Sequence, residues 1–193
     1  FFLLAAVLSC SQRSTYITIT GFAQGGTYTV KFNSEGIQST PEQVRDSIDA
    51  LLSRIDNSLS GYNKKSLLSS FNSGETIFPD EMFMDIYSLS YDVFEQTEGA
   101  VDVASAPLFD IWGFGFANDS LPSSEKVMEV MISSGMSRLK MSMQVAEDGS
   151  LNPADLLVEP GALPMLNYNA IAQGYSCDAV ARYLYSVGVK DML

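Results

Sequence analysis

Histidine is absent from this sequence of 193 residues. Its absence excludes, within these residues, a Ser-His-Asp or Cys-His nucleophile system and any zinc or iron site with His ligands. Only two cysteines are present, Cys10 and Cys177, so a disulfide framework is excluded as well. Basic residues are also scarce, since 11 Lys and Arg stand against 23 Asp and Glu. This balance argues against nucleic-acid binding, because phosphate contacts need clustered Lys or Arg.

The sequence does contain enough apolar material for a packed core. Hydrophobic residues make up 46% of the chain and charged residues 18%, which excludes disorder as the dominant state. The acidic residues are spread along the chain and not gathered in a tail, as expected for a solvated acidic surface. We therefore expect one ordinary domain, or one and a fraction.

The first eight residues are all apolar and are followed by Ser9 and Cys10. Eight residues are too few to span a bilayer as a helix, which needs roughly 20. The four residues ending at Cys10 resemble a bacterial lipobox, so we expect residues 1–10 to be a signal-peptide remnant with lipidation at Cys10. The alternative is an ordinary signal peptide with a chance cysteine. Because the sequence starts at Phe1 and stops at Leu193, we expect a fragment cut at both ends.

The pattern of apolar and turn residues predicts mixed short strands packed with amphipathic helices, an α+β fold. Thr40, Pro41 and Gln43 have the order of a capping box, which predicts a helix from 41 to about 55. Residues 58–72 are polar and predict a loop. The other expected elements are strands at 16–20, 27–32, 138–142 and 163–167 and helices at 80–98, 125–134 and 174–187.

Three segments have residues that suit ligand binding. The first, residues 21–28, is a Gly-rich bend between two predicted strands. It lacks the Gly-Lys and the following helix of a P-loop. A tight β-turn uses the same residues, so a purely structural role stays open.

The second segment, residues 97–115, places Asp102 inside an apolar run. An unpaired buried charge costs several kcal/mol, so Asp102 should hold backbone N–H groups, a ligand or a cation. Residues 113–115 lack the third glycine of a dinucleotide fingerprint and follow no predicted strand, which excludes a Rossmann motif. We expect Trp112 to be a core anchor.

The third segment, residues 167–178, leads from a predicted strand into the last helix. A helix N-terminus offers N–H groups to a phosphate. Asn167, Asn169 and Gln173 supply amides for recognition of a polar heterocycle. No base accompanies Cys177 in the sequence, so we expect a buried, unreactive thiol.

In this order, the three segments resemble the flavin transferase family, the ApbE-type FAD:protein FMN transferases once called thiamine-biosynthesis lipoproteins. The family pattern Gly-x-Ala-Met-Gly-Thr-x-Tyr matches residues 21–28, with Gln24 for Met and Gly26 for Thr. The pattern Thr-x-Gly-Ala-Phe-Asp, followed by Pro-Leu and Trp-Gly-Phe-Gly, matches residues 97–115, with Val101 for Phe.

Two further matches extend the resemblance over almost the whole chain after Cys10. The pattern Asp-Leu-Gly-x-Ile-Ala-Lys-Gly-Tyr-x-x-Asp matches residues 167–178, with Asn167 for Asp, Asn169 for Gly and Gln173 for Lys. A Ser-x-Tyr…Ser…Asn stretch is matched by Ser60, Tyr62, Ser66 and Asn72.

The resemblance implies an ApbE-like fold and a Mg²⁺-dependent transfer of FMN from FAD to a Thr or Ser hydroxyl of an acceptor protein, with release of AMP. It implies Ala170 as a metal ligand through its backbone carbonyl. The FAD contacts that it implies are Gln24, Tyr62, Ala100, Val101, Asp102, Asn167 and Gln173.

The sequence also departs from the family. One carbonyl does not hold Mg²⁺, which takes six oxygens including carboxylates, and the family's other ligands, an Asp and a Thr, lie beyond Leu193. We therefore expect the C-terminal part of the flavin transferase domain, which begins at residue 11, to be missing and these residues alone to be inactive. Gln173 in place of Lys removes a cation near the phosphates.

Three functions follow as hypotheses. The leading one is a lipid-anchored flavin transferase in the bacterial cell envelope, facing the periplasm and modifying an exported subunit of a membrane redox complex. The second is a lipoprotein that binds or hydrolyses FAD without modifying an acceptor. The third is a surface lipoprotein with an interaction role, whose melting temperature FAD leaves unchanged.

Overall fold

A computed structural model describes residues 15–114, 121–145, 151–163 and 165–193. The expected signal remnant with Cys10, and Gly115 of the second segment, lie outside these ranges. Within them, no helix is both long and apolar enough to cross a membrane.

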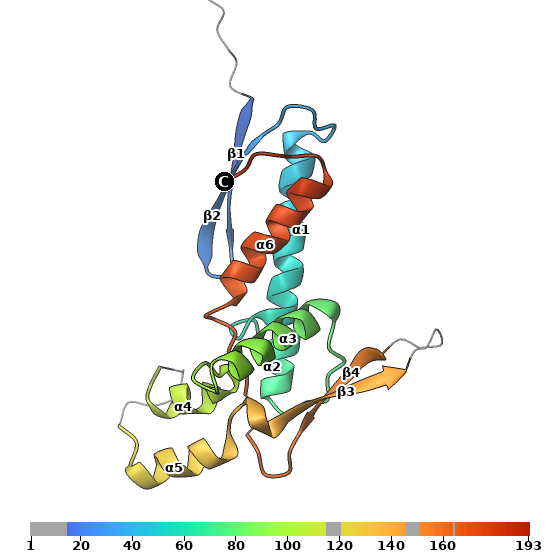
Figure 1. Cartoon of the computed structure of the whole chain (residues 1–193). Helices are drawn as coiled ribbons and strands as arrows, with labels where there is room; N and C mark the ends of the chain where they lie inside the picture. Colours follow the sequence, from blue (N-terminus) through green and yellow to red (C-terminus); the bar gives the residue numbers. More distant parts are fainter. Residues whose placement is uncertain (1–14, 115–120, 146–150, 164) are drawn as a thin grey trace, which may run out of the picture.

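The described part of the chain begins with an antiparallel hairpin of β1 (Tyr16–Ala23) and β2 (Gly26–Asn33). Its strands and Gly-rich turn confirm the prediction for this region. The hairpin packs against the long helix α1 (Pro41–Leu59), which in turn packs against α6 (Ala172–Ser186). In Figure 1 the hairpin lies beside these two helices and α6 runs in front of α1. Ile19 of β1 and Phe32 of β2 are buried in this contact. The α1 and α6 helices thus fix where the hairpin turn lies.

Helix α1 begins as its capping box predicts. The Thr40 hydroxyl accepts from the Gln43 backbone N–H, and the Gln43 side chain accepts from the Thr40 N–H. Its buried face contains Val44, Ile48, Leu52 and Ile55. This spacing turns one stripe of the helix toward α6 and the hairpin.

The predicted loop at 58–72 is wrong in part, because it contains the short helix α2 (Leu67–Asn72). The Ser66 hydroxyl caps this helix by accepting from the Ser69 N–H at 2.9 Å, and it donates to the Ser60 carbonyl at 2.5 Å. Helix α3 (Glu81–Gln96) follows and crosses below α1 (Figure 1). Asp80 caps α3 by accepting from the Phe83 N–H.

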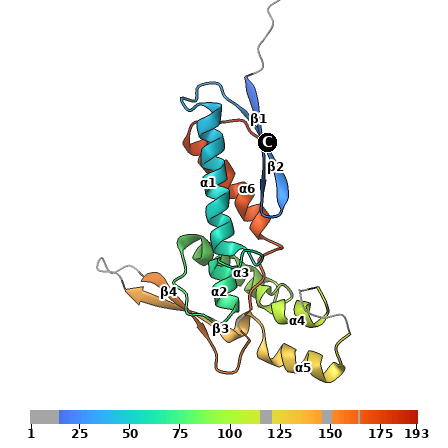
Figure 2. The same cartoon turned by 180° about the vertical axis from the view of Figure 1, so that it is seen from behind.

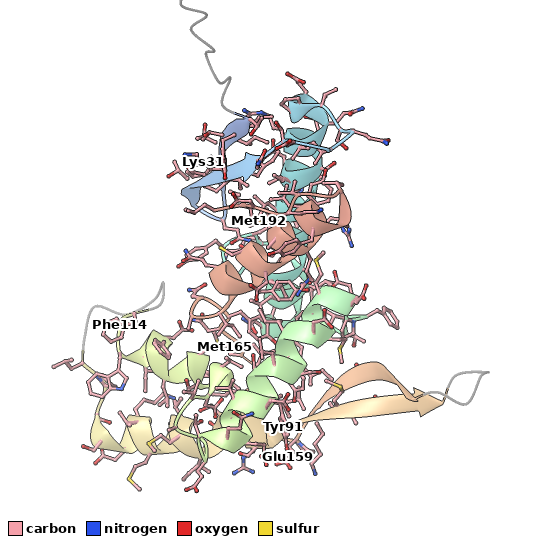
Figure 3. The ribbon with its side chains drawn as sticks, turned by 45° about the horizontal axis from the view of Figure 1, so that its top comes forward. Lys31, Tyr91, Phe114, Glu159, Met165 and Met192 are labelled. Carbon is pink, nitrogen blue, oxygen red and sulfur yellow. The ribbon has the colours of Figure 1, made fainter. Side chains whose placement is uncertain are left out.

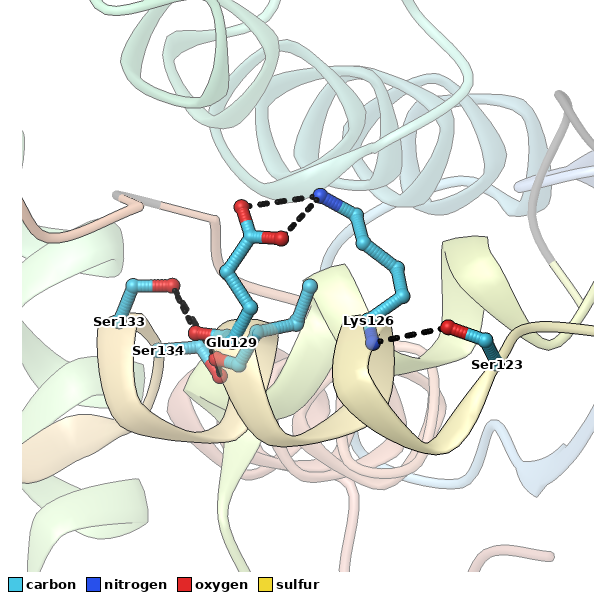
Figure 4. A network of polar contacts seen from close by, with 6 residues as sticks. Ser123, Lys126, Glu129, Ser133 and Ser134 are labelled. Carbon is cyan, nitrogen blue, oxygen red and sulfur yellow. Dashed lines mark hydrogen bonds and ion pairs between the residues drawn. The ribbon is translucent and has the colours of Figure 1, made fainter.

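Beyond α3, a 3₁₀ turn at Val103–Ser105 leads into α4 (Ala106–Ile111), which contacts α5 (Ser124–Ser133). These two helices lie at the end of the molecule away from the β1–β2 hairpin (Figure 2). Ser123 caps α5, and Lys126 pairs with Glu129 at 3.1 Å on its exposed side (Figure 4). An exposed pair of this kind stabilises little.

A second antiparallel hairpin consists of β3 (Leu139–Val145) and β4 (Leu151–Val158). Strand β4 was not predicted. The strand predicted at 163–167 is wrong, since none of its described residues belongs to a sheet. Instead, the Asn72 side chain accepts from the Leu166 N–H at 2.8 Å and donates to the Leu166 carbonyl at 2.9 Å. One amide side chain thus replaces a neighbouring strand at this position.

Three aromatic rings join α2, α3 and the segment before α6. Phe83 packs edge-on against Phe71 and Tyr168, with ring centroids 6.2 and 5.9 Å apart. Trp112, expected in the core, is 47% exposed, so that expectation is wrong. The core here is built around Phe83 instead.

The end of the chain extends the first hairpin. Lys31 of β2 and Leu193 exchange two backbone hydrogen bonds, of 2.8 and 2.7 Å, and Met192 forms a bridge with Phe32. Figure 3 shows Met192 close to Lys31 at this edge of β2. The outer edge of β2 is therefore paired where residues 191–193 lie.

The hydroxyls of Tyr87 and Tyr168 are buried and have no hydrogen-bond partner among the described residues. Burial raises the pKa of Tyr87 to about 12, and burial together with the neighbouring Tyr87 raises the pKa of Tyr168 well above its ordinary value. The pKa of each hydroxyl is higher in the folded state than in the unfolded state. Its contribution to the free energy of unfolding is therefore fully present below about pH 10 and is lost as the pH rises toward the folded-state pKa.

We predict that Tyr168→Phe weakens the loss of stability at alkaline pH. The wild-type protein should lose up to about 1.4 kcal/mol more than the variant per pH unit above about pH 10. At pH 7 the variant should match or exceed the wild type by up to about 1 kcal/mol, since no buried hydroxyl is left unpaired. Urea unfolding at pH 7, 9 and 11 measures this difference, and equal pH slopes would contradict it.

Candidate functional site: a cleft between the hairpin turn and the first turn of α6

The turn between β1 and β2 places Gln24 at the edge of a cleft. Gln24 and Gly25 have φ of 52° and 77°, and Ala23 pairs with Gly26 across the turn. Two consecutive positive φ angles are typical of a type I′ hairpin turn. A positive φ is less favourable for Gln than for Gly or Asn. The turn therefore determines the backbone conformation of Gln24.

Gly21 lets this hairpin lie close to its own tyrosine. A Cβ atom at Gly21 would lie 2.5 Å from the Tyr28 ring, so only glycine fits without displacing that ring. The Tyr28 hydroxyl donates to the Asp49 carboxylate of α1 at 2.5 Å. Burial, and then this hydrogen bond, raise the pKa of Tyr28 to about 12. Tyr28 thus ties the hairpin to α1 as a neutral phenol.

The opposite wall comes from the end of α1 and the turn after it. The Ser60 hydroxyl accepts from the Tyr62 and Asn63 N–H groups, and Asn63 donates through Nδ2 to Asp56 at 2.9 Å. The Tyr62 ring is 65% exposed, and its hydroxyl accepts from Asn169 Nδ2 at 3.4 Å. Hydrogen bonds thus hold the backbone under Tyr62 while its aromatic ring faces solvent.

The floor of the cleft is the turn that leads into α6. The Asn167 side chain accepts from the Asn169 N–H at 2.9 Å, and the Asn167 N–H donates to the Val103 carbonyl at 2.8 Å. Asn167 therefore connects this turn with the segment around Asp102. Gln173 lies in the first turn of α6 and is exposed.

These walls enclose a cleft of 640 Å³. Three of the predicted FAD contacts, Gln24, Tyr62 and Gln173, line it together. Its other lining residues are Gly25, Ile55, Asp56, Leu59, Ser60, Asn63, Asn169 and Ala172.

A second hollow of 540 Å³ lies on the other side of Gln24 and Gln173, between β2 and α6. These two glutamines line both hollows. The second hollow is more apolar, and its walls include Val30, Val180 and Leu184. The side-chain amides of Gln24 and Gln173 therefore lie at the border between the cleft and the more apolar second hollow.

Neither hollow is lined by a Lys or Arg among the described residues. Asp56 is the acidic group of the first cleft and Asp178 that of the second. An anionic ligand would therefore meet amides, hydroxyls and two carboxylates here, so its charge must be compensated by groups other than those of the walls.

The structure uses the Asp102 carboxylate to hold backbone donors. Oδ1 accepts from the Ala104 N–H at 2.7 Å, and both carboxylate oxygens lie 3.1 Å from the Met136 nitrogen. Asp102 thus caps the 3₁₀ turn before α4 and fixes the Met136–Arg138 turn after α5. Of the partners expected from the sequence, backbone N–H groups are observed, and contact with FAD stays a prediction.

The remaining predicted contacts lie outside both hollows. Ala100 and Val101 are exposed, in a turn where the Val101 N–H donates to the Thr97 hydroxyl at 3.1 Å. Ala170 is exposed in the turn before α6. The structure therefore gathers three of the seven predicted FAD contacts into the cleft and leaves four outside it, with Asn167 supporting its floor.

A family model for the ApbE family matches residues 24–193 of this chain. The chain belongs to the ApbE family. It is 27% identical over 197 residues to the FAD:protein FMN transferase of Haemophilus influenzae, a match that covers 97% of this chain and 54% of the relative. For the same-named protein of Escherichia coli K12 the identity is 27% over 157 residues, covering 78% and 42%. The chain spans about half the length of these curated relatives.

Solved ApbE structures have the same fold. The flavin transferase ApbE from Vibrio cholerae superimposes with a TM-score of 0.77 at 27% identity, over 92% of this chain and 55% of that one. The apo flavinyl transferase ApbE from Pseudomonas stutzeri gives 0.79 at 27% identity, with the same coverage. These matches confirm the predicted α+β, ApbE-like fold.

Part of the ApbE sequence pattern is structural in this chain. Ser66 caps α2, and Asn72 bonds both polar groups of the Leu166 backbone. These contacts hold the segment that leads to the floor of the cleft. Ser66 and Asn72 therefore support the shape of the cleft although neither residue lines it.

The described residues do not provide a Mg²⁺ site. They contain no cluster of three His, Cys, Asp or Glu side chains. The Ala170 carbonyl is one oxygen, and Mg²⁺ requires an octahedron of them. We therefore derive no step of the chemistry from a metal held by these residues.

Sequence reasoning missed Asp56, Asn63 and Ser176. Asp56 and Asn63 line the cleft, and Ser176 lies in the second hollow, where it accepts from Gln24 Nε2 at 2.6 Å. Cys177 is exposed and not buried as expected. The spacing of Ser176 within a helix gave no sign of this contact, since its partner is 152 residues away.

Proposed function

We propose that the full-length protein transfers FMN from FAD to a Thr or Ser hydroxyl of an exported acceptor protein and releases AMP, in a Mg²⁺-dependent reaction. One observation carries the proposal: Gln24, Tyr62 and Gln173, which the ApbE resemblance assigns to FAD, converge on one cleft from three distant parts of the sequence. The relatives named FAD:protein FMN transferase support it.

In this reaction the acceptor oxygen forms a bond to the phosphorus of the FMN half, and the bond from that phosphorus to the oxygen of AMP breaks. The hydroxyl proton passes to solvent, and AMP leaves with the bridging oxygen. Positioning and electrostatic stabilisation together contribute most of the catalysis of phosphoryl transfer. The part assigned to this chain is to bind and orient the flavin nucleotide with Tyr62 as an aromatic wall and the two glutamines as amide contacts. We assign no catalytic base to it.

The test combines the full-length protein with FAD, Mg²⁺ and an acceptor that carries a flavin-attachment Thr, and measures intact mass. We expect the acceptor to gain the mass of FMN less one water, and we expect no gain when EDTA is present during the reaction. Free FMN and AMP without a mass gain would replace the proposal by FAD hydrolysis. A melting temperature unchanged by FAD would favour the interaction role, because a ligand of the native state raises it.

We also propose that the protein is anchored in the bacterial cell envelope by a lipid on Cys10, facing the periplasm, where its acceptor belongs to a membrane redox complex. The apolar run before Cys10 supports this. Cys10→Ala should move the protein from the membrane fraction to the periplasmic fraction. Retention in the membrane fraction would contradict the anchor.

A further inference from the structure

The contact between Gln24 and Ser176 joins the hairpin turn to α6 at the border of the two hollows. Ser176 is buried, with 6% of its surface exposed, and Gln24 is partly buried. The Gln24 Nε2 to Ser176 Oγ distance is 2.6 Å. Because Ser176 lies inside the protein, water does not compete freely for this contact.

The single proton of the Ser176 hydroxyl determines which way the Gln24 amide faces. Ser176 Oγ donates it to the Ala172 carbonyl, one helical turn back, at 2.8 Å. A hydroxyl has one proton to donate, so toward Gln24 it acts as an acceptor. The Gln24 group that faces Ser176 is therefore the NH₂ group.

This orientation leaves the Gln24 carbonyl oxygen, Oε1, for a ligand. No donor among the described residues bonds to Oε1, and Gln24 lines both hollows. The backbone of Gln24 is fixed by the hairpin turn, with φ of 52°. Gln24 is held at its backbone by the turn and at its NH₂ group by Ser176, so Oε1 faces one direction and less side-chain entropy is lost on binding.

We propose that Ser176 is a positioning residue that holds the Gln24 amide so that Oε1 accepts a hydrogen bond from an N–H or O–H group of the bound flavin nucleotide. The inference rests on the proposed function, because it takes the ligand of the cleft to be FAD. Such a donor occurs in both halves of FAD, as the imide of the flavin ring and as the amine of adenine. Ser176 itself contacts no ligand in this proposal.

The experiment measures the dissociation constant of FAD for the full-length wild type, Ser176→Ala, Gln24→Met and the double variant. Ser176→Ala should weaken binding about fivefold, as expected for the loss of one neutral hydrogen bond. In the Gln24→Met background the same change should have less than about a twofold effect, because no amide remains to be oriented. Ser176→Thr, which keeps the hydroxyl, should restore binding.

A structural role for Ser176 predicts a different result. If Ser176→Ala weakens binding equally in the wild-type and the Gln24→Met backgrounds, or has no effect in the wild-type background, the proposal is wrong. Thermal unfolding of the wild type and of each variant tests whether each is folded at the assay temperature, and only folded variants enter the comparison. If the wild type itself binds no FAD, the proposed function fails and not this inference alone.

Binding of FMN and of ADP, each measured separately, identifies the half of FAD that donates. A loss confined to FMN places the donor on the flavin half, and a loss confined to ADP places it on the adenosine half. With a functional assay, KM for FAD should rise while kcat stays within about twofold, since orientation of one binding contact acts on ground state and transition state alike. Equal affinities of wild type and Ser176→Ala for both probes would overturn the proposal.

Discussion

Asp102→Ala is expected to lower the free energy of unfolding by about 3 kcal/mol, which corresponds to a fall in melting temperature of roughly 6–12 °C. The carboxylate accepts hydrogen bonds from the backbone N–H groups of Ala104 and Met136. In the sequence, Ala104 precedes α4 and Met136 follows α5. Removing the carboxylate leaves both N–H groups without their charged partner. Urea unfolding at pH 7 measures the change.

Asp46→Ala serves as the control, because Asp46 is an exposed residue of α1 whose removal should change stability by less than about 0.5 kcal/mol. Asp102→Asn should lose less than Asp102→Ala, since its one carbonyl oxygen replaces only part of the carboxylate. FAD affinity is measured on the folded variant at low temperature. A variant with wild-type stability and weakened FAD binding would show that Asp102 acts on the ligand and not on the fold.

The elements that were predicted well are those whose signals are local. The capping box at Thr40 and the alternating residues on either side of the Gln24 turn act within a few positions of the sequence. Each needs no distant partner to be effective. The hairpin and α1 are accordingly found where the sequence placed them.

The errors occur where a distant partner decides the structure. The segment around Leu166 has the composition of a strand, but its backbone is bonded by the side chain of Asn72, 94 residues away. Trp112 ends α4, which lies at the end of the molecule away from the β1–β2 hairpin, and it is 47% exposed despite its size. Hydrophobicity alone does not determine burial at such a position.

The candidate site shows the same division. Three of the positions that the resemblance assigns to FAD, Gln24, Tyr62 and Gln173, line one cleft, and their contact with FAD stays a prediction. The resemblance did not distinguish residues that line the cleft from residues, such as Asn167, whose hydrogen bonds support the cleft from outside. That distinction depends on which way each polar group is directed, and a sequence of one protein does not contain it.

Tyr62→Ala is expected to weaken FAD binding by roughly 10- to 100-fold, the value of one aromatic ring stacked on a heterocycle. Tyr62 is 65% exposed and lines the cleft, so its ring is accessible to a ligand and contributes little to the folded core. Stability should therefore change by less than about 0.5 kcal/mol. Titration of FAD fluorescence measures the dissociation constant.

Two controls separate stacking from other effects of Tyr62. Tyr62→Phe keeps the ring and should bind FAD within about threefold of the wild type, because the stacking surface is retained and the 3.4 Å contact of the hydroxyl with Asn169 is a long one. Tyr185→Ala removes a tyrosine of similar exposure, 62%, that lines neither hollow, and should leave the affinity unchanged. If Tyr62→Ala binds FAD as tightly as Tyr185→Ala does, the Tyr62 ring is no part of the flavin site.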